Sequence, residues 1–299
     1  MHLMIPHAGS LDEAARHAFA SLALPNLATL LARLSPADTW GSDEFSPLPP
    51  HTLALAALRG QAEPSAAAWA ASAGPELAWA LMTPVHLAVG TDGVDVLPPA
   101  ALQLSESDAA RFAAALHALW PAAEGWQWQL LDVTRWAVGH ATALDDPELA
   151  RTASIERAAG RPIEPWLPQS RVLRRWQNEA QMLLHGHALN DEREARGAHA
   201  VNSVWIGDIG RANGRPADVT VDARLTEPLL NGDLAAWAEA WQRLDAGPLA
   251  ALATHPGTIS LTLGGERFAT RFTAQPLSFI EKLRRRFRTS DVAAVLEAL

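Results

Sequence analysis

Hydrophobic residues that recur every three or four positions predict helices along much of the chain. Ser10 and Ser105 precede two of these stretches and are placed to act as N-caps. Pro25 opens another, as proline often does in the first turn of a helix. The predicted helices are Leu11–Leu22, Leu27–Leu34, Thr52–Arg59, Ser65–Ser72, Ser105–Trp120, Gln169–His185, Asn190–Arg196, Leu234–Leu244, a segment containing Leu283–Phe287, and Val292–Leu299.

Shorter apolar or alternating runs predict strands between these helices. Thr91-Asp92-Gly93 separates two such runs within Leu77–Leu97, which indicates a β-hairpin. Ser35–Pro50 is rich in proline and glycine, so we expect a loop there. The predicted strands are His2–Pro6, the two within Leu77–Leu97, Trp126–Leu130, Trp136–Val138, Asn202–Gly207, Val219–Ala223, Ile259–Leu263 and Phe268–Phe272.

Alternating strands and helices are typical of α/β proteins. We therefore expect a mixed, mostly parallel sheet with helices on both faces and an added hairpin or small lobe. The sequence predicts one domain over residues 1–299, with a smaller lobe around residues 77–160.

Composition and charge narrow the function classes. The 299 residues include no cysteine, which excludes disulfides, thiol catalysis and thiolate metal sites. The net charge of −9 argues against general nucleic-acid binding, because contacts to phosphate supply much of that affinity. No apolar run is long enough for a membrane span, and the N-terminus lacks a signal-peptide pattern. We expect a cytoplasmic protein with no nucleic-acid or membrane partner.

The segment from Leu184 to Gly210 is the part of the sequence richest in side chains that can bind a ligand. Arginine matches phosphate or carboxylate through two parallel hydrogen bonds, and asparagine and glycine-loop amides add neutral donors. This combination of side chains is suited to holding an anion.

The same segment resembles the archaeal-type cofactor-independent phosphoglycerate mutases, which belong to an alkaline-phosphatase-like superfamily. The matching positions are His187, Asn190, Arg193, Gly197, Asn202, Trp205, Gly207 and Gly210, with Ala188 in place of a proline. With the preceding Trp176–His185, the run is still more similar to bacterial RpfE-type regulatory proteins, distant members of that group. This second resemblance extends over most of the chain, including Leu24–Leu27 and Leu261–Arg267. It implies an alkaline-phosphatase-like core. The family resemblance also implies an anion pocket, whose candidate ligand-binding residues are His187, Asn190, Arg193 and Asn202.

The departures from the family pattern bear on activity. Active members carry Asp-Gly after the first strand, a serine or threonine nucleophile, and aspartate–histidine pairs near the C-terminus. Here the first strand leads into Pro6-His7-Ala8-Gly9, the nucleophile region offers Thr52, and Leu263–Arg267 contains no aspartate–histidine pair. The resemblance therefore implies a catalytically degenerate protein without metal or cofactor. Its expected role is regulation, or binding of a phosphorylated small molecule or a protein partner. The alternative is an active metal-dependent mutase or hydrolase of phosphate esters.

Structural explanations compete with several of these assignments. Without the family resemblance, Arg193 and Arg196 are expected on a solvated helix face, where Glu192 and Arg196 are spaced to form an ion pair. With it, Arg193 is expected to face a site and Arg196 to turn away from it. His185 and His199 are expected to be structural, and Trp205 to lie in the core. Arg284–Arg288 is expected to be a solvated helix face.

Overall fold

The computed structural model describes residues 1–61, 65, 76–91, 93–215, 217–274 and 291–299. Predictions for Ser65–Ser72, Asp92, Leu283–Phe287 and Arg284–Arg288 fall wholly or largely outside these residues. The chain forms two compact units, Met1–Leu55 with Pro216–Leu299, and Ala56–Arg215. The expectation of a single domain with a lobe around residues 77–160 stays a prediction.

The first unit is built on a five-stranded mixed sheet in the order β2-β11-β10-β1-β9. Strand β1 lies parallel to both of its neighbours, β10 and β9, whereas β10–β11 and β11–β2 are antiparallel. The α/β class with a mixed sheet is thus confirmed. The strands are β1 (His2–Ile5), β2 (Ser35–Gly41), β9 (Thr220–Val221), β10 (Ser260–Gly264) and β11 (Phe268–Thr273).

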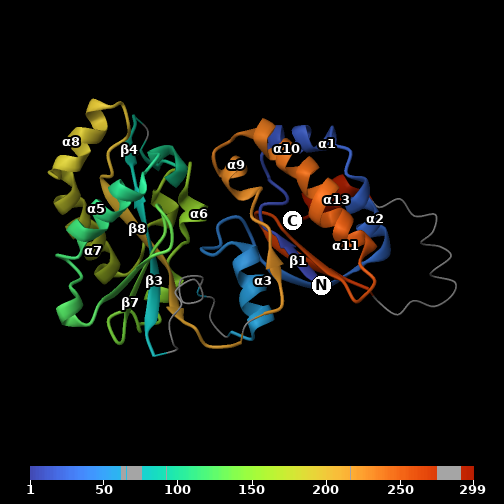
Figure 1. The fold of residues 1–299 in the computed structure, drawn as a ribbon, viewed down its shortest axis with the longest axis horizontal. Helices are drawn as coiled ribbons and strands as arrows, with labels where there is room; N and C mark the ends of the chain where they lie inside the picture. The colour runs from blue at the N-terminus through green and yellow to red at the C-terminus, as the bar shows by residue number, and fades with distance from the viewer. Residues whose placement is uncertain (62–64, 66–75, 92, 216, 275–290) are drawn as a thin grey trace. The chain divides into compact units, whose positions relative to one another are not determined.

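Helices cover this sheet and close its core (Figure 1). Buried side chains of β1 and β10 pack against helix side chains such as Leu27, Trp241 and Leu252. Burial of so much apolar surface is the main stabilising contribution. The helices are α1 (Glu13–Ala20), α2 (Pro25–Arg33), α3 (Pro50–Arg59), α9 (Thr226–Leu230), α10 (Leu234–Leu244), the π-helical η5 (Asp245–Leu249), α11 (Ala250–Thr254) and α13 (Val292–Glu297).

Two sequence predictions in this unit are wrong. The predicted loop Ser35–Pro50 begins with the strand β2, which is the edge of the sheet, where proline costs no inner ladder hydrogen bond. Pro36 lies at a register irregularity opposite Phe272. Helix α1 begins after Asp12 instead of Ser10, because the Asp12 carboxylate accepts from the Ala15 amide at 2.8 Å. The Ser10 hydroxyl instead donates to Glu266 at 2.7 Å.

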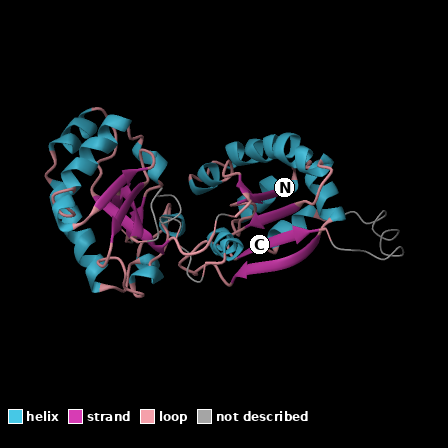
Figure 2. Cartoon of the chain, turned by 60° about the horizontal axis from the view of Figure 1, so that its bottom comes forward, coloured by secondary structure: helices cyan, strands magenta, loops and turns pink. Residues whose placement is uncertain are grey.

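The second unit contains a four-stranded antiparallel sheet in the order β6-β7-β3-β8, drawn in magenta in Figure 2. The strand following Asn202 runs on to Arg211, through residues 208–211 that the sequence placed in a loop. A separate pair, β4–β5, forms the hairpin that the sequence predicted, with its Asp92 outside the described residues. The strands are β3 (Ala78–Val85), β4 (Leu87–Val89), β5 (Val94–Val96), β6 (Gln127–Leu130), β7 (Trp136–His140) and β8 (Ser203–Arg211).

Both faces of this second sheet are buried. Ala80 and Met82 of β3 pack with α5 and α7 residues such as Phe112 and Leu173, while Trp79 faces the other way. Alternate residues of a strand point to opposite faces, so β3 is apolar at nearly every position. The helices are α5 (Glu106–Leu116), α6 (Ile155–Ala158), α7 (Arg171–His185), α8 (Ala188–Ala195), and the 3-10 turns η1 (Pro99–Leu102), η2 (Ala122–Glu124), η3 (Leu149–Arg151) and η4 (Glu164–Trp166).

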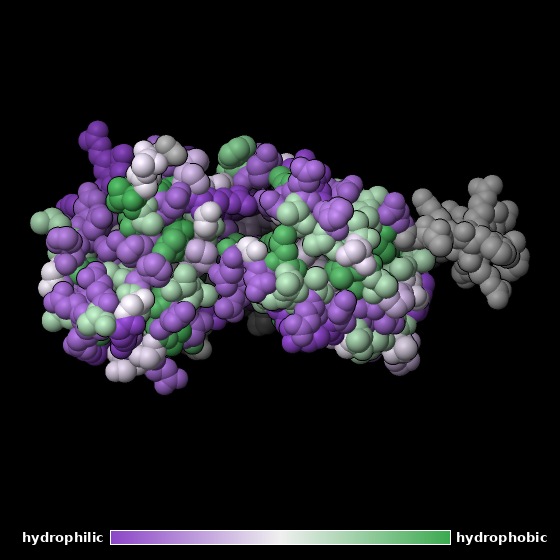
Figure 3. Space-filling view, turned by 90° about the horizontal axis from the view of Figure 1, so that it is seen from above, coloured by the Kyte–Doolittle hydropathy of each residue, from purple (hydrophilic) through white to green (hydrophobic). Residues whose placement is uncertain are grey.

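The surface mixes polar and apolar side chains on the face that Figure 3 shows. Large apolar side chains that are exposed, such as Phe45 and Met182, are scattered along the sequence. No helix among the described residues is both long and apolar enough to cross a membrane.

Gly139 on β7 provides a test of the packing of the second sheet. A Cβ placed there would lie 2.9 Å from the Trp79 indole, which is fully buried. We expect Gly139→Ala to lower the free energy of unfolding by about 1–3 kcal/mol, because an overpacked core must shift. Urea denaturation measures this change.

Gly186 is the matched control, since a Cβ there has no heavy atom within 4 Å and its φ of −101° suits any residue. Gly186→Ala should leave the unfolding midpoint nearly unchanged. An equal effect of both substitutions would contradict the packing explanation.

Candidate functional site

The predicted anion-binding residues lie in the second unit, on α8 and at the start of β8. His187 is the N-cap of α8, and its Nδ1 accepts from the Leu189 amide at 3.2 Å. Its ring packs against Phe112 of α5 with centroids 5.4 Å apart. A histidine in this position satisfies a free amide in the first turn of the helix, so one of its two ring nitrogens is already bonded to the backbone.

Arg193 is fully buried, with a relative exposure of 0%. Its Nη1 donates to the Asp108 carboxylate of α5 at 2.6 Å, its Nε to the His199 carbonyl at 2.9 Å, and its Nη2 to the Leu102 carbonyl. All three guanidinium nitrogens therefore have acceptors within the chain. Buried charges are stable only when they are paired in this way.

Arg196 lies beside this pair and does not behave as expected. Its guanidinium contacts the Asp108 carboxylate that Arg193 also binds. The predicted Glu192–Arg196 pair is wrong, because Glu192 instead binds Arg111 of α5 through both carboxylate oxygens, at 2.6 and 2.7 Å. The i,i+4 spacing allowed a local pair, but the guanidinium of Arg111 reaches Glu192 from another helix.

Asn190 and Asn202 each hold a piece of backbone. The buried Asn190 carboxamide donates to the Leu184 and Val201 carbonyls at 2.9 Å and accepts from the Val201 amide at 2.8 Å. The Asn202 carboxamide accepts from the Leu87 amide at 2.8 Å and donates to its carbonyl at 2.9 Å. Each carboxamide thus makes the two backbone hydrogen bonds that a neighbouring strand would make. Asn190 holds the backbone of Val201 in this way, and Asn202 holds that of Leu87.

Two of the four residues have the same structural role. Asn190 and Arg193 both hydrogen-bond to the segment that leads from α8 into β8. His187 points to Phe112, and Asn202 to Leu87. The geometry favours a scaffold for this segment. Anion binding by these four residues stays a prediction, and it would need the present contacts of Arg193 to open.

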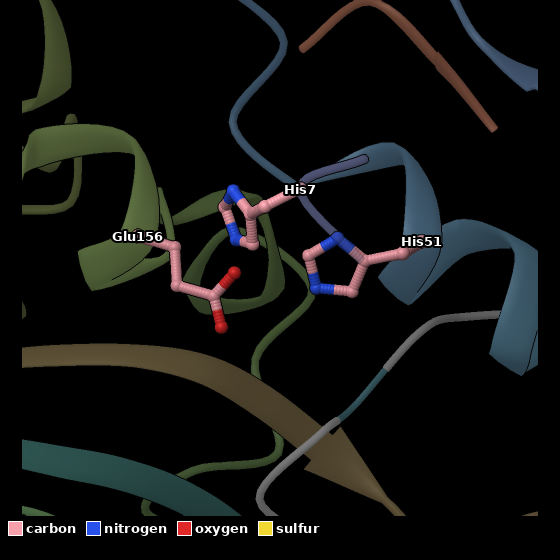
Figure 4. Close-up of side chains that lie close together, drawn as sticks. All are labelled: His7, His51 and Glu156. Carbon is pink, nitrogen blue, oxygen red and sulfur yellow. The ribbon is translucent and has the colours of Figure 1, made fainter. Parts of the chain in front are cut away.

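A second candidate site lies in the first unit, where β1 ends. In sheets with parallel strands, ligands bind outside the carboxyl ends of those strands. His7 follows β1 there with a φ of +55°, a conformation uncommon outside glycine. Its ring lies 5.3 Å from that of His51 on α3, centroid to centroid, as Figure 4 shows. In the sequence His7 stands out only as part of the segment that replaces the family's Asp-Gly, and nothing singles out His51.

The tight backbone around this pair fixes where the rings lie. The Ala8 amide donates to the Gly264 carbonyl at 2.7 Å, and the Trp237 indole donates to the His7 carbonyl at 3.2 Å. A Cβ on Gly264 would lie 3.0 Å from the His51 Cβ, so a side chain there would press against His51. These contacts fix the backbone that carries His7 and leave no room for a side chain at residue 264 beside His51.

This pair does not match the ligand set of a two-metal phosphoryl-transfer site. Such a site needs several carboxylates and histidines around two ions a few ångströms apart. Among the described residues of the first unit, no three histidine, aspartate and glutamate side chains converge on one point. Two imidazoles fit a single transition metal better, and would supply part of its coordination.

A buried carboxyl in the second unit also stands out. Asp208 of β8 is 4% exposed and has a φ of +53°. Burial raises the pKa of Asp208 to about 7, the negative charge of Glu156 adds to the rise, and a 3.1 Å hydrogen bond from the Ser154 hydroxyl opposes it. A carboxyl with such a pKa exchanges a proton near neutral pH, a property common at functional sites.

Comparison with known proteins gives little beyond general shape. No protein family matches the sequence, and no curated protein does. Solved structures similar to the chain include the cofactor-independent phosphoglycerate mutase from Thermoplasma acidophilum, with 14% identity and a TM-score of 0.35 over 100% of this chain and 99% of that one. The PH0037 protein from Pyrococcus horikoshii has 11% identity and a TM-score of 0.45, over 91% of this chain and 87% of that one.

Arg193 can be tested as a structural residue. We expect Arg193→Met to lower the free energy of unfolding by about 3–5 kcal/mol. Asp108 would keep only the half-exposed Arg196 as a partner, and the Leu102 and His199 carbonyls would lose their donor. Thermal and urea unfolding measure this.

The control is Arg111→Met, which breaks an ion pair with Glu192 whose side chains are 45% and 52% exposed. Exposed pairs contribute at most about 1 kcal/mol, so this variant should be nearly as stable as the original chain. Equal stabilities for the two variants would refute the scaffold assignment.

The raised pKa of Asp208 predicts that the protein becomes less stable as pH rises towards neutral. Because its pKa rises from 3.8 to about 7 on folding, the native state keeps a proton between these values that the unfolded state releases. The free energy of unfolding should fall as pH rises through this window, by about 4 kcal/mol at about 1.4 kcal/mol per pH unit.

Asp208→Asn removes the ionisable group, and asparagine tolerates positive φ. We expect the variant to match the original chain near pH 4 and to be more stable at pH 8. A stability difference that is the same at both pH values would show that ionisation of Asp208 is not responsible.

Proposed function

We propose that this chain is a phosphoglycerate-mutase-like protein that acts by binding or regulation and not by two-metal phosphoryl transfer. The observation that carries the proposal is the composition of the site at the end of β1. His7 follows this strand where the family resemblance implies a metal-binding aspartate, and it packs against His51, next to Thr52.

Charge explains why this replacement matters. Two adjacent divalent cations are stabilised by several negative ligands, and each carboxylate also offsets cation–cation repulsion. Neutral imidazoles supply lone pairs but no negative charge. Replacing a carboxylate by His7 therefore weakens the site for two metals, which supports a binding role on an inherited scaffold.

The ligand class follows from the resemblance and stays part of the proposal. The expected ligand is a phosphorylated small molecule, with a protein partner as the other possibility that RpfE-type regulatory proteins suggest. The contacts of Arg193 and Asn190 support a different contribution from them, namely holding the turn between α8 and β8.

The second candidate function is a metal-dependent mutase or hydrolase of phosphate esters. It is favoured by the imidazole pair itself, since histidine nitrogen is a preferred ligand of zinc and other transition metals. A single bound metal acting on a phosphate ester would need both rings in their neutral form.

Activity and metal binding separate the two candidates. We expect the purified protein, supplied with Mn²⁺ or Zn²⁺, to show no turnover of 3-phosphoglycerate or p-nitrophenyl phosphate above the metal-only rate. The reason is the carboxylate-poor site. Phosphate release and metal content per chain are the measurements.

Variants make the test specific. Turnover that requires metal and is lost in His7→Ala and His51→Ala, but kept in His185→Ala, would overturn the proposal in favour of the enzyme. His185 is a suitable control because it is exposed at the end of α7, in the other unit.

A further inference from the structure

The second unit contains a pocket of about 300 Å³ that none of the preceding assignments uses. It lies where the β4–β5 hairpin, the helix α7 and the first residues of β8 meet. The volume corresponds to roughly ten waters and reaches the lower end of the range for small-molecule sites.

One wall of the pocket is apolar and extended. Val85, Leu87 and Val89 alternate along the end of β3 and through β4, so their side chains share one face. Ile163 and Trp205 line the pocket as well, and the Trp205 indole nitrogen already donates to the Ala153 carbonyl at 2.8 Å. Val85 and Trp205 are 0% and 2% exposed, so the apolar surface open to an incoming molecule comes from Leu87, Val89 and Ile163. The indole offers it no hydrogen bond.

Three carboxamide side chains of α7 also line the pocket, and of these Gln177 is half-buried while Asn178 and Gln181 are exposed. Gln177, Asn178 and Gln181 line the pocket, and Gln177 and Gln181 are spaced to share one face of the helix. In the described part of the chain, no hydrogen bond engages these three side chains. Each presents a donor and an acceptor side by side.

None of the described residues that line the pocket carries a charge. Asn202, one of the residues predicted to bind an anion, does line it, but its carboxamide is fully paired with Leu87. An anion would lose its hydration here without gaining a counter-charge, which is unfavourable. The chemistry of the walls therefore selects an uncharged molecule.

We infer that this pocket binds a neutral planar heterocycle whose edge carries adjacent hydrogen-bond donors and acceptors, of the kind found in purine bases. The apolar strand wall takes the ring faces. A carboxamide pairs with such an edge through two hydrogen bonds, as asparagine and glutamine do with adenine. The site is separate from the histidine pair of the first unit, and its ligand differs from the phosphorylated one of the proposed function.

Adenosine is a suitable probe, with inorganic phosphate as the charged comparison. We expect isothermal titration to show adenosine binding, and phosphate not to compete with it. Gln177→Met and Gln181→Met keep side-chain length but remove the carboxamide, and each should weaken binding about tenfold, the usual loss when one such pair is removed. Amide hydrogen exchange should slow in residues 85–89 when adenosine binds.

Gln169→Met is the matched control, because Gln169 precedes α7 and does not line the pocket. It should bind adenosine as the original chain does. Absence of adenosine binding, or binding that neither glutamine variant weakens, would overturn the inference. Tight binding of a simple aliphatic amide, with no binding of adenosine, would also overturn it. That result would show that the pocket accepts apolar groups but does not recognise the edge of a base.

Discussion

The buried carboxylate of Asp108 is the point on which the central part of the second unit depends. It lies in the first turn of α5, where its amide is capped by Ser105, and its side chain faces Arg193 of α8 and Arg196. Removing two charges from water costs several kcal/mol, which close pairing must offset. The guanidinium of Arg193 also satisfies the carbonyls of Leu102 and His199, so one side chain ties α5, η1, α8 and the approach to β8 together.

This arrangement explains why the most informative segment of the sequence is not a simple ligand site in the structure. Arginine and asparagine are the residues that recognise anions, but they are also the residues that satisfy buried carbonyls. The sequence shows which side chains can donate hydrogen bonds, but it does not show which acceptor each of them meets in the fold. Asp108 is 85 residues away from Arg193, and no local pattern links them.

The same distinction between local and long-range information runs through the fold. Helices such as α5, α7 and α10 follow from apolar periodicity and caps, since these signals act within a few residues. Strand β2 does not, because it pairs with β11 and depends on a segment more than 200 residues later. Likewise the contact between His7 and His51 could not be predicted, since it depends on β1 and α3 meeting in space.

The hydrogen bonds already made within the protein differ among three groups of side chains. These groups are Arg193 with Asn190, His7 with His51, and Gln177 with Gln181. Arg193 and Asn190 are fully engaged by their own chain, so a ligand could reach them only by displacing contacts that stabilise the fold. The His7 backbone accepts a hydrogen bond from the Trp237 indole, and His51 lies against Gly264 and against the His7 ring. Gln177 and Gln181 line a pocket with no internal hydrogen bond in the described structure. A ligand is recognised at the least cost where polar groups are positioned but not yet paired. By this argument the glutamines of α7 are better placed to bind a ligand than Arg193 and Asn190, which hold the second unit together.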